Sequence, residues 1–478
     1  MILQSFDQVL SADDVALLAR LVEVWNGRRN SNLTRSIYYD GESALKDFGI
    51  SLPPQMRGLS AALGWVGKGV RAVTDRSRFE GVLSADGTDD PFELGQVLAE
   101  NQFQSEYPQA KVSSAVHGCA FIAVSLDSFG RPLMHMVAAD AGAGVWDTSK
   151  RRLSGFLEVV ELDEVTRAMT LVLYTPEKAV TIEVNEGTPR IADVVTHGLG
   201  IVTAVPMPYA PELRRPLGHS RITRAAMYYS DAALRTIVRS EVSAEFYSAP
   251  EYWLFGADVS AFQDADKWSA VMGRIKALEY QEGDPKPELH RFSGASPQPH
   301  TDQLRMWSSL FADDQDLEVK FADSSNPSSA DAIFAAKETL ITTTRDANIR
   351  WDSAAASAMR IAVMLRDGMT EPTDELRKLS IRSTDPAIVS PSARADAFSK
   401  LSAAIDGFGM SEVGMEFAGL SREQIIRFQT ERQRDQAGSR FQGLIEAAKS
   451  IRAVNDGDSG ASVGVPAGEP VASASGSA

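Results

Sequence analysis

The sequence predicts an α+β fold that is mostly helical, with an antiparallel β meander and one very long helix. One reason is that residues 328–367 contain no glycine or proline, although the chain has 35 glycines and 22 prolines among its 478 residues. A second is that apolar residues recur every two positions from about 116 to 205, and every three to four positions in most of the remaining chain. The alternating runs are short and consecutive, which predicts hairpins rather than parallel βαβ units.

The segment without glycine or proline predicts a single helix of roughly 60 Å, at about 1.5 Å per residue. Asn326 and Pro327 suit its start, and Arg366 followed by Gly368 suits its end. We interpret this helix as a spine, because a helix of this length needs support all along it. The residues expected on one stripe are Ile333, Leu340, Ala347, Trp351, Ala354, Ala358, Ile361 and Leu365.

Residues 1–115 are predicted to be helical. Ser11–Asp14 resembles a capping box, and the helix that it begins is predicted to end in a turn at Asn30–Asn32. Further helices are predicted near Leu59–Thr74 and Pro91–Phe103.

Residues 116–205 are predicted to form the meander, with a hairpin turn at Asp127–Gly130. Prolines at 206, 208, 211 and 216 predict a stiff connector over 206–222. Cys119 lies in an apolar run and is interpreted as an inert core thiol. The predicted strands are Cys119–Ser125, Leu133–Val137, Phe156–Leu162, Met169–Tyr174 and Val180–Val184.

The second half of the chain is predicted to return to helices. Residues 248–299 are rich in glycine and proline and predict a small module of short strands with one helix near Lys267–Leu278. Ser421–Gln424 has the form of a capping box, and the helix after it is predicted to reach Val454. Residues 455–478 are rich in Gly, Ser and Ala, which predicts disorder. The other predicted segments are a helix over 223–247, a returning helix over 300–312, an acidic loop over 313–327 and the long helix over 328–367.

Composition excludes several classes of protein. The chain has 48 Lys and Arg against 64 Asp and Glu, a formal net charge of −16, whereas domains that grip nucleic acid through its phosphates are usually basic. A single cysteine excludes an internal disulfide framework and a zinc site built from several thiolates. No signal peptide and no membrane-spanning segment are predicted.

The sequence predicts no catalytic, cofactor-binding or metal-binding residue. Gly64–Gly69 contains glycines and a lysine but lacks the spacing and the Ser or Thr of a P-loop. Asp86–Asp90 lacks the ligand spacing of a calcium loop. The six histidines are scattered, without the spacing of a zinc site.

Several short motifs in order resemble one known family. They are Tyr38–Glu42 with Gly49–Pro54, Gly64–Val66 leading into Val70–Arg76, Arg215–Ile222, Arg239–Tyr247, Asn326–Ile333, and Ser411–Gly414 with Gly419–Ile425. Together they are similar to the portal proteins of tailed bacteriophages, in the branch common in phages of actinobacteria. The resemblance covers roughly Arg35 to Val454.

This resemblance implies a ring, usually of twelve copies, at one capsid vertex of the virion, assembled in the host cytoplasm. Double-stranded DNA would enter and leave through its channel. The terminase large subunit and then a head–tail adaptor would dock on it, beside the major capsid and scaffolding proteins, and the chain itself would be no enzyme. The implied regions are a wing (1–222), a stem helix (223–247), a clip (248–299), a returning stem helix (300–312), a tunnel loop (313–327), a long wing helix (328–367) and a crown (368–454).

The resemblance also selects candidate channel residues. Acids in the loop would discourage DNA from adhering, although they also fit an ordinary solvated loop. Arg235 and Arg239, four positions apart on the stem helix, would meet either DNA or Glu241 and Glu245 of a neighbouring copy. The tunnel-loop candidates are Asp313, Asp314, Asp316, Glu318, Lys320 and Asp323, of which Lys320 is the one cation.

The sequence leaves two other functions open. The chain could be a cytoplasmic multidomain enzyme whose catalytic groups converge only in three dimensions, or another ring-forming connector of the virion. The packing of the long helix is open as well. The small residues of the long helix fit packing between copies as well as packing within one chain.

Overall fold

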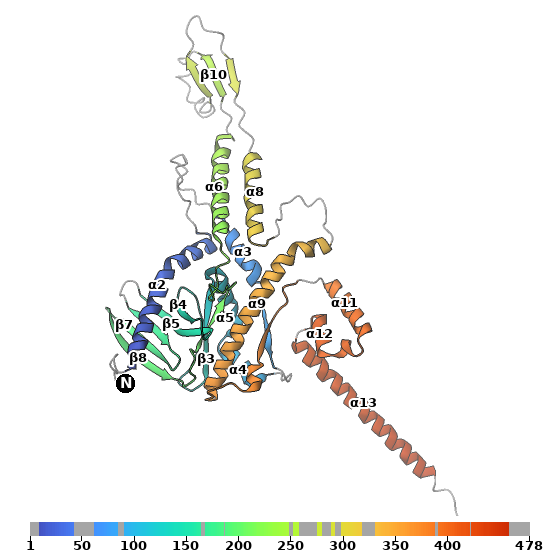
Figure 1. The fold of residues 1–478 in the computed structure, drawn as a ribbon. Helices are drawn as coiled ribbons and strands as arrows, with labels where there is room; N and C mark the ends of the chain where they lie inside the picture. Colours follow the sequence, from blue (N-terminus) through green and yellow to red (C-terminus); the bar gives the residue numbers. More distant parts are fainter. Residues whose placement is uncertain are drawn as a thin grey trace, which may run out of the picture. The chain divides into compact units, whose positions relative to one another are not determined.

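The computed structural model describes residues 9–42, 62–84, 90–163, 168–185, 187–247, 252–257, 275–279, 288–291, 298–317, 330–387, 391–420 and 422–457. The chain divides into two compact units, Met1–Pro386 and Ala387–Ala478. Figure 1 shows that the chain has the mixture of helices and antiparallel sheets that the sequence predicts.

The helices of the first unit are α2 (Ala12–Asp40), α3 (Trp65–Thr74), η2 (Pro91–Glu93), α4 (Leu94–Glu100), α5 (Phe103–His117), α6 (Arg224–Tyr247), α8 (Gln298–Asp314), α9 (Ala330–Arg366) and α10 (Asp374–Arg377). Its strands are β1 (Phe79–Leu83), β2 (Cys119–Leu126), β3 (Pro132–Val137), β4 (Gly142–Asp147), β5 (Arg152–Leu162), β6 (Met169–Tyr174), β7 (Lys178–Asn185), β8 (Thr188–Thr196), β9 (Ala204–Pro208), β10 (Tyr252–Ala257), β11 (Ile275–Glu279), β12 (Glu288–Arg291) and β13 (Ser380–Ser383).

The predicted single meander is two sheets. Strands β4 to β8 form a five-stranded antiparallel meander, and β3-β2-β9 forms a separate three-stranded sheet. The prediction of one sheet was wrong because β9, which contains Pro206 and Pro208, does not act as a connector but pairs with β2. Strand β9 lies at the edge of its sheet. An edge strand tolerates prolines, because only one of its sides pairs with a neighbouring strand and the missing N–H group can lie on the other side.

Alternating side chains join the two sheets into layers. Phe121 of β2 lies 4.6 Å, between ring centroids, from Phe156 of β5, so these faces pack together. Ile122 points to the opposite face of β2, which α5 and α9 cover, and Leu157 points to the opposite face of β5, where Leu21 of α2 packs. Each sheet therefore has one face on the other sheet and one face under helices.

A polar bridge crosses between the sheets. Nε2 of His135 in β3 lies 2.8 Å from Glu158 Oε1, and the Tyr174 hydroxyl donates to Glu158 Oε2 at 2.9 Å. Burial lowers the pKa of His135, but the hydrogen bond and charge of Glu158 outweigh burial and leave that pKa raised.

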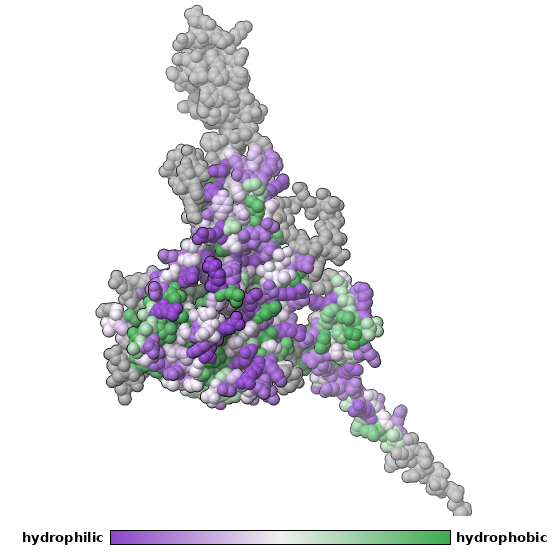
Figure 2. Space-filling model, viewed as in Figure 1, coloured by the Kyte–Doolittle hydropathy of each residue, from purple (hydrophilic) through white to green (hydrophobic). Residues whose placement is uncertain are grey.

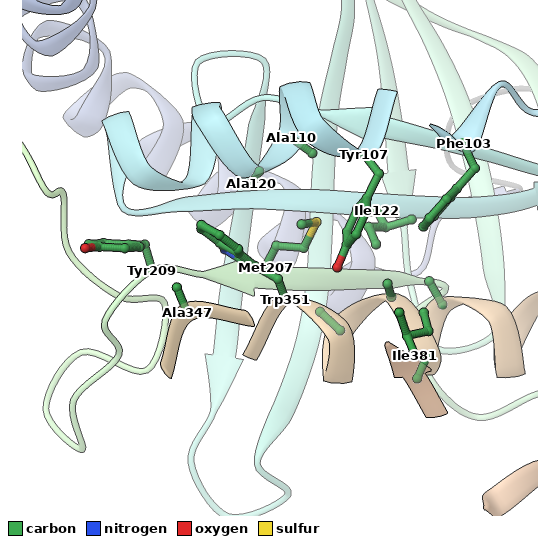
Figure 3. Packing of buried hydrophobic residues seen from close by; sticks show 14 of the residues in the cluster. Phe103, Tyr107, Ala110, Ala120, Ile122, Met207, Tyr209, Ala347, Trp351 and Ile381 are labelled. Carbon is green, nitrogen blue, oxygen red and sulfur yellow. The ribbon is translucent and has the colours of Figure 1, made fainter. Parts of the chain in front are cut away.

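The long helix exists, and most of its predicted stripe lies in one hydrophobic core cluster of the first unit, while the side chain of Ile333 lies outside the described residues. Helix α9 has 37 residues, about 55 Å at 1.5 Å per residue. Trp351 is fully buried, and its indole Nε1 donates to Ser114 Oγ of α5 at 3.0 Å. Figure 3 shows Trp351 beside Met207 and Tyr209, whose ring centroid lies 6.1 Å from that of the indole, so α9 packs within its own chain. Asn326 and Pro327 lie outside the described residues.

One other prediction for the first unit was wrong, and a second was wrong over part of its length. Helix α2 runs through Asn30–Asn32 without a turn, because Asn32 is buried and its amide donates to the Ala139 carbonyl at 3.0 Å. The last part of the helix predicted near Lys267–Leu278 is contradicted by β11, which pairs in parallel with β10, whereas 267–274 lie outside the described residues. Backbone pairing with a neighbouring strand outweighs the local helical pattern there. The capping box at Ser11 and Asp14 is confirmed.

The second unit begins later than the crown that the resemblance implied. Strand β13 pairs with β1, so residues up to Pro386 belong to the first unit. The second unit contains α11 (Pro391–Ala404), η4 (Phe408–Met410), α12 (Glu412–Ala418) and α13 (Arg422–Gly457). Helix α13 includes 455–457 of the segment predicted to be disordered, and 458–478 lie outside the described residues, as does Ser421. Figure 2 shows hydrophobic residues gathered over α11 and α12.

Candidate functional site

The candidate site is the antiparallel helix pair α6–α8 and the junction at its base. Two contacts define the pairing: Ser243 Oγ of α6 lies 3.1 Å from His300 Nε2 of α8, and Tyr229 of α6 stacks on Trp307 of α8 at 6.4 Å between centroids. Tyr228 meets the same indole edge-on at 6.1 Å. Figure 1 shows the two helices side by side. The stem helices predicted over 223–247 and 300–312 are both present as helices.

Arg221 is the centre of the junction. It is buried, and its guanidinium donates in three directions: Nε to the Gly69 carbonyl at 2.9 Å, Nη1 to the Tyr209 hydroxyl at 2.9 Å, and Nη2 to the Gln315 carbonyl. Gln315 is also buried and returns a bond from Nε2 to the Arg221 carbonyl at 3.2 Å. One side chain thus connects α3, the end of β9 and the turn after α8, using the fork geometry that lysine lacks.

Two predicted tunnel-loop acids belong to this junction. Asp314 Oδ2 accepts from Thr223 Oγ1 at 2.8 Å and from Gln315 Nε2 at 2.7 Å. Thr223 Oγ1 in turn accepts from the amide of Ala226 in the first turn of α6. Asp314 therefore links the last turn of α8 to the first turn of α6.

Asp316 links the same turn to α9. Its Oδ2 lies 3.8 Å from Arg221 Nη1 and accepts from Thr343 Oγ1 at 3.2 Å. The hydrogen bonds of both acids give them a structural role that the sequence did not predict. Asp313, in contrast, is exposed on α8.

Two glycines of the sequence that resembled a phosphate loop explain why α3 fits the junction. A Cβ on Gly67 would lie 2.8 Å from the Tyr39 carbonyl oxygen, and a Cβ on Gly69 would lie 2.8 Å from Gln315 Oε1. Both distances are too short for a side chain, so the glycines allow close helix packing. Their position inside α3, as the sequence predicted, supports a structural role.

The remaining predicted site residues are divided between the surface and the segments outside the description. Arg235 is half-buried and Arg239 is exposed on α6, as is Glu241. The side chain of Glu245, and the whole of Glu318, Lys320 and Asp323, lie outside the described residues. The pairing of the stem arginines with a neighbouring copy stays a prediction.

Reactive groups in the described part of the chain are few. Cys119 is buried on β2, and burial raises the pKa of its thiol, in agreement with the predicted core role. Within the described ranges, no group of three or more His, Cys, Asp and Glu side chains could hold a metal ion. No helix among these residues is both long and apolar enough to cross a membrane.

Comparison with known proteins identifies the family. A family model described as phage portal protein, SPP1 Gp6-like, matches residues 25–437. The chain belongs to this family of phage portal proteins. Two curated relatives, both named portal protein, are 27% identical: that of Mycobacterium phage L5 over 439 residues (88% of this chain, 89% of the relative) and that of Mycobacterium phage D29 over 405 residues (82% of each).

A solved structure, the neck of a native GTA particle computed with C12 symmetry, is similar to 81% of this chain and 99% of that chain, with a TM-score of 0.41 and 13% identity. Membership of the portal family confirms the resemblance that the short motifs carried. One of these motifs, Arg215–Ile222, contains the buried Arg221. The sequence did not predict the part that Arg221 and Gln315 play, because nothing local marks a buried arginine.

Proposed function

We propose that copies of this portal-family chain close side by side into a ring, usually of twelve, around a channel for double-stranded DNA at one capsid vertex. In this proposal the wing is 1–222, the stem is α6 and α8, the clip is 248–299 and the crown follows the long wing helix. DNA enters during packaging and leaves during ejection.

The observation that carries the proposal is the fixed helix pair α6–α8. Arg221 connects its base to α3 and the end of β9, and Asp316 connects it to α9, so the pair is anchored to the main core at several points. A channel wall that carries moving DNA needs such anchoring, because force on the stem is then shared by the packed wing. The aromatic contacts of Trp307 hold the two helices to each other.

The negative charge of the chain supports a channel through which DNA passes without adhering to the wall. The chain carries a formal net charge of −16, and duplex DNA carries about one negative charge per 1.7 Å of its axis. Asp313 is exposed on α8 and would repel phosphates from a stem wall. Asp314 and Asp316 add negative charge but are held in hydrogen bonds.

The ring serves as a platform and has no catalytic step of its own. The terminase large subunit docks on it during filling and hydrolyses ATP, and a head–tail adaptor docks afterwards. Major capsid and scaffolding proteins surround it in the virion, which assembles in the host cytoplasm. A portal ring thus couples the packaging motor to the head without binding nucleotide.

Sizing of the purified chain tests the ring. Twelve copies of 51.7 kDa give roughly 620 kDa. We expect light scattering to report a particle of this order, with a central hole in end-on images. A monomer or dimer at high concentration would instead favour an enzyme, and a ring without a hole would favour a different connector.

Charge reversal on the stem tests the channel. Asp313→Lys should leave the ring intact but reduce the yield of DNA-filled heads in a phage complementation assay, because a cation ring would hold phosphates. Asp193→Lys, on the exposed surface of β8, is the matched control and should package normally. Equal yields from the two variants would contradict a stem that faces DNA.

A further inference from the structure

An arginine-lined cleft of about 1090 Å³ opens between α2 and the segment that precedes α6. Helix α2 contributes three of its arginines, spaced so that they lie on one face together with Val24 and Ser31. None of the residues that line the cleft is Asp or Glu, although acids outnumber bases in the chain. Its six arginines are Arg20, Arg28, Arg35, Arg214, Arg215 and Arg224.

Two arginines of the cleft act on a third. None of the six forms an ion pair with a carboxylate of the described residues. Burial, followed by the charges of Arg28 and Arg215, lowers the pKa of Arg35, whose Nη1 donates only to the His117 carbonyl at 3.2 Å. Asp140 acts on the cleft residue His117 but forms no ion pair with the arginines, so a negatively charged occupant would be stabilised beside them.

The wall opposite α2 is held rigidly. Gly218 adopts φ +78°, and a Cβ there would lie 2.3 Å from the Tyr209 carbonyl oxygen and 2.5 Å from that of Gly118. The amide of His219 donates to the Tyr209 carbonyl at 3.0 Å, and the amide of Arg221 donates to the Ala115 carbonyl at 2.9 Å. The backbone of Arg215 is also bonded to that of Glu212 in both directions, at 2.8 and 3.2 Å, so Arg214 and Arg215 project from a loop whose backbone is held in place and loses less entropy on binding.

The cleft is apolar beneath its arginines. Trp25, Phe121 and Leu217 line it, and Leu213 beside the cleft arginines is 93% exposed. Apolar surface under a rim of guanidinium groups suits a protein segment that carries carboxylates and apolar side chains. A DNA duplex is contacted through its outer phosphates and has no apolar surface to place in a recess.

We propose that this arginine cleft is the seat for an acidic surface segment of a second copy of this chain. The proposal rests on the ring proposed above. Copies with a formal charge of −16 repel one another, so a local excess of positive charge on one of the two faces favours a contact between them. A heterologous ring contact joins different faces of successive copies, which a cleft on one side and an acidic segment on the other satisfy.

Neutralising the cleft tests the seat. The triple variant Arg28→Gln, Arg214→Gln, Arg215→Gln keeps the buried arginine contacts and removes three charges. The control variant Arg345→Gln, Arg377→Gln, Arg382→Gln removes three charges from exposed ion pairs elsewhere, which contribute little to stability. Mass photometry should show the cleft variant dissociating at protein concentrations at least about tenfold higher than the control, equivalent to about 1.4 kcal/mol.

Several outcomes would overturn the seat. If the wild type and both triple variants form rings equally well, the cleft holds no second copy. If the cleft variant forms normal rings but loses retention of duplex DNA on a gel, the occupant is nucleic acid. A wild-type chain that stays monomeric overturns the ring and the seat together, whereas wild-type rings with an unaffected cleft variant overturn the seat alone.

A photo-cross-linker placed at Leu213 identifies the occupant directly and leaves every arginine in place. Illumination of assembled rings should give chain-to-chain products, and mass spectrometry should find the attached peptide to be an acidic peptide of this same chain. Attachment within one chain, to DNA, or to no peptide would contradict the proposal.

Discussion

Helices α9 and α13 have nearly equal lengths, 37 and 36 residues, but very different surroundings. In α9, side chains such as Trp351, Ala355 and Ala358 are fully buried against the sheet β3-β2-β9 and α5. In α13, Ile425 is the one described side chain that is buried, and Phe441 is 66% exposed.

The difference shows that a long helix can be stabilised in two ways. Most helical stability in proteins comes from packing of one face, and α9 has that face inside its own chain. Within the single chain, α13 lacks it over nearly all of its described length and depends on local propensity and pairs such as Arg427 with Glu431. Apolar residues of α13, including Leu444 at 69% exposure, are therefore exposed in the single chain.

The largest expected effect is the loss of the buried indole of α9. Trp351→Ala should lower the free energy of unfolding of the first unit by about 3–5 kcal/mol, because it leaves a cavity and removes the bond to Ser114. Urea denaturation measures this. Ile349→Ala on the same helix, where the side chain is 69% exposed, should change stability by less than about 0.5 kcal/mol. If both variants lowered the free energy of unfolding by similar amounts, the contrast between the buried and the exposed face of α9 would be contradicted.

A pH-dependent effect comes from the buried cation beside α9. Lys111 donates to Ser77 Oγ at 2.7 Å and lies 4.2 Å from the Tyr107 ring. Burial lowers the pKa of Lys111 to about 8, although the charge of Asp352 acts in the opposite direction. Above this pH the folded chain has released the proton, while the unfolded chain keeps it until about pH 10.4.

Between about pH 8 and about pH 10.4 the unfolded chain holds a proton on Lys111 that the folded chain has released. The free energy of unfolding therefore rises with pH over this range, by about 3 kcal/mol in total. Lys111→Met should remove that rise, so the difference in unfolding free energy between the variant and the wild type should change by this amount as the pH increases. Urea curves at several alkaline pH values measure it. A pH-independent difference would show that Lys111 keeps its proton in the folded chain.

Replacing a small side chain by a larger one in each of the two long helices compares how closely they are packed. Ala358→Leu in α9 should cost about 1–3 kcal/mol, because the added methyl groups have no space. Ala437→Leu in α13 is the matched control, since Ala437 is exposed and should tolerate the change within about 0.5 kcal/mol. Thermal unfolding monitored by circular dichroism compares them. If the larger side chain in α9 is tolerated as well as the one in α13, close packing of α9 is contradicted.

The smallest effect is expected on α13. Phe441→Ala should leave the stability of the dispersed chain within about 0.5 kcal/mol of the wild type, because the ring is already in water. Differential scanning calorimetry of a dilute, ring-free sample measures this. A loss above about 1.5 kcal/mol would show that α13 packs on its own chain.

The sequence predicted the elements whose signals are local. Uninterrupted helical spacing predicted α9, and alternation with a turn at Asp127–Gly130 predicted the β2–β3 hairpin. It did not predict features that depend on distant partners. Asn32 lies inside α2 because the carbonyl of Ala139 accepts its amide, and the residues of β9 form a strand because β2 is beside them.

The candidate site divides in the same way. The sequence alone shows that residues 313–323 are acidic. It does not show the hydrogen bonds of Asp314 with Thr223 and of Asp316 with Thr343, because these join residues far apart in the chain. Arg221 belongs to a motif that the resemblance singled out, yet its burial follows only from the packing of α3, β9 and α8. Long-range hydrogen bonds of this kind have no sequence signature.

A cryo-EM reconstruction of the purified full-length chain tests the portal assignment most directly. We predict a closed ring in which the α6–α8 pairs of successive copies surround an open channel wide enough for a double helix, with Asp313 facing that channel. A ring whose α6–α8 pairs lie on its outer surface, or a particle without a central opening, would contradict the account.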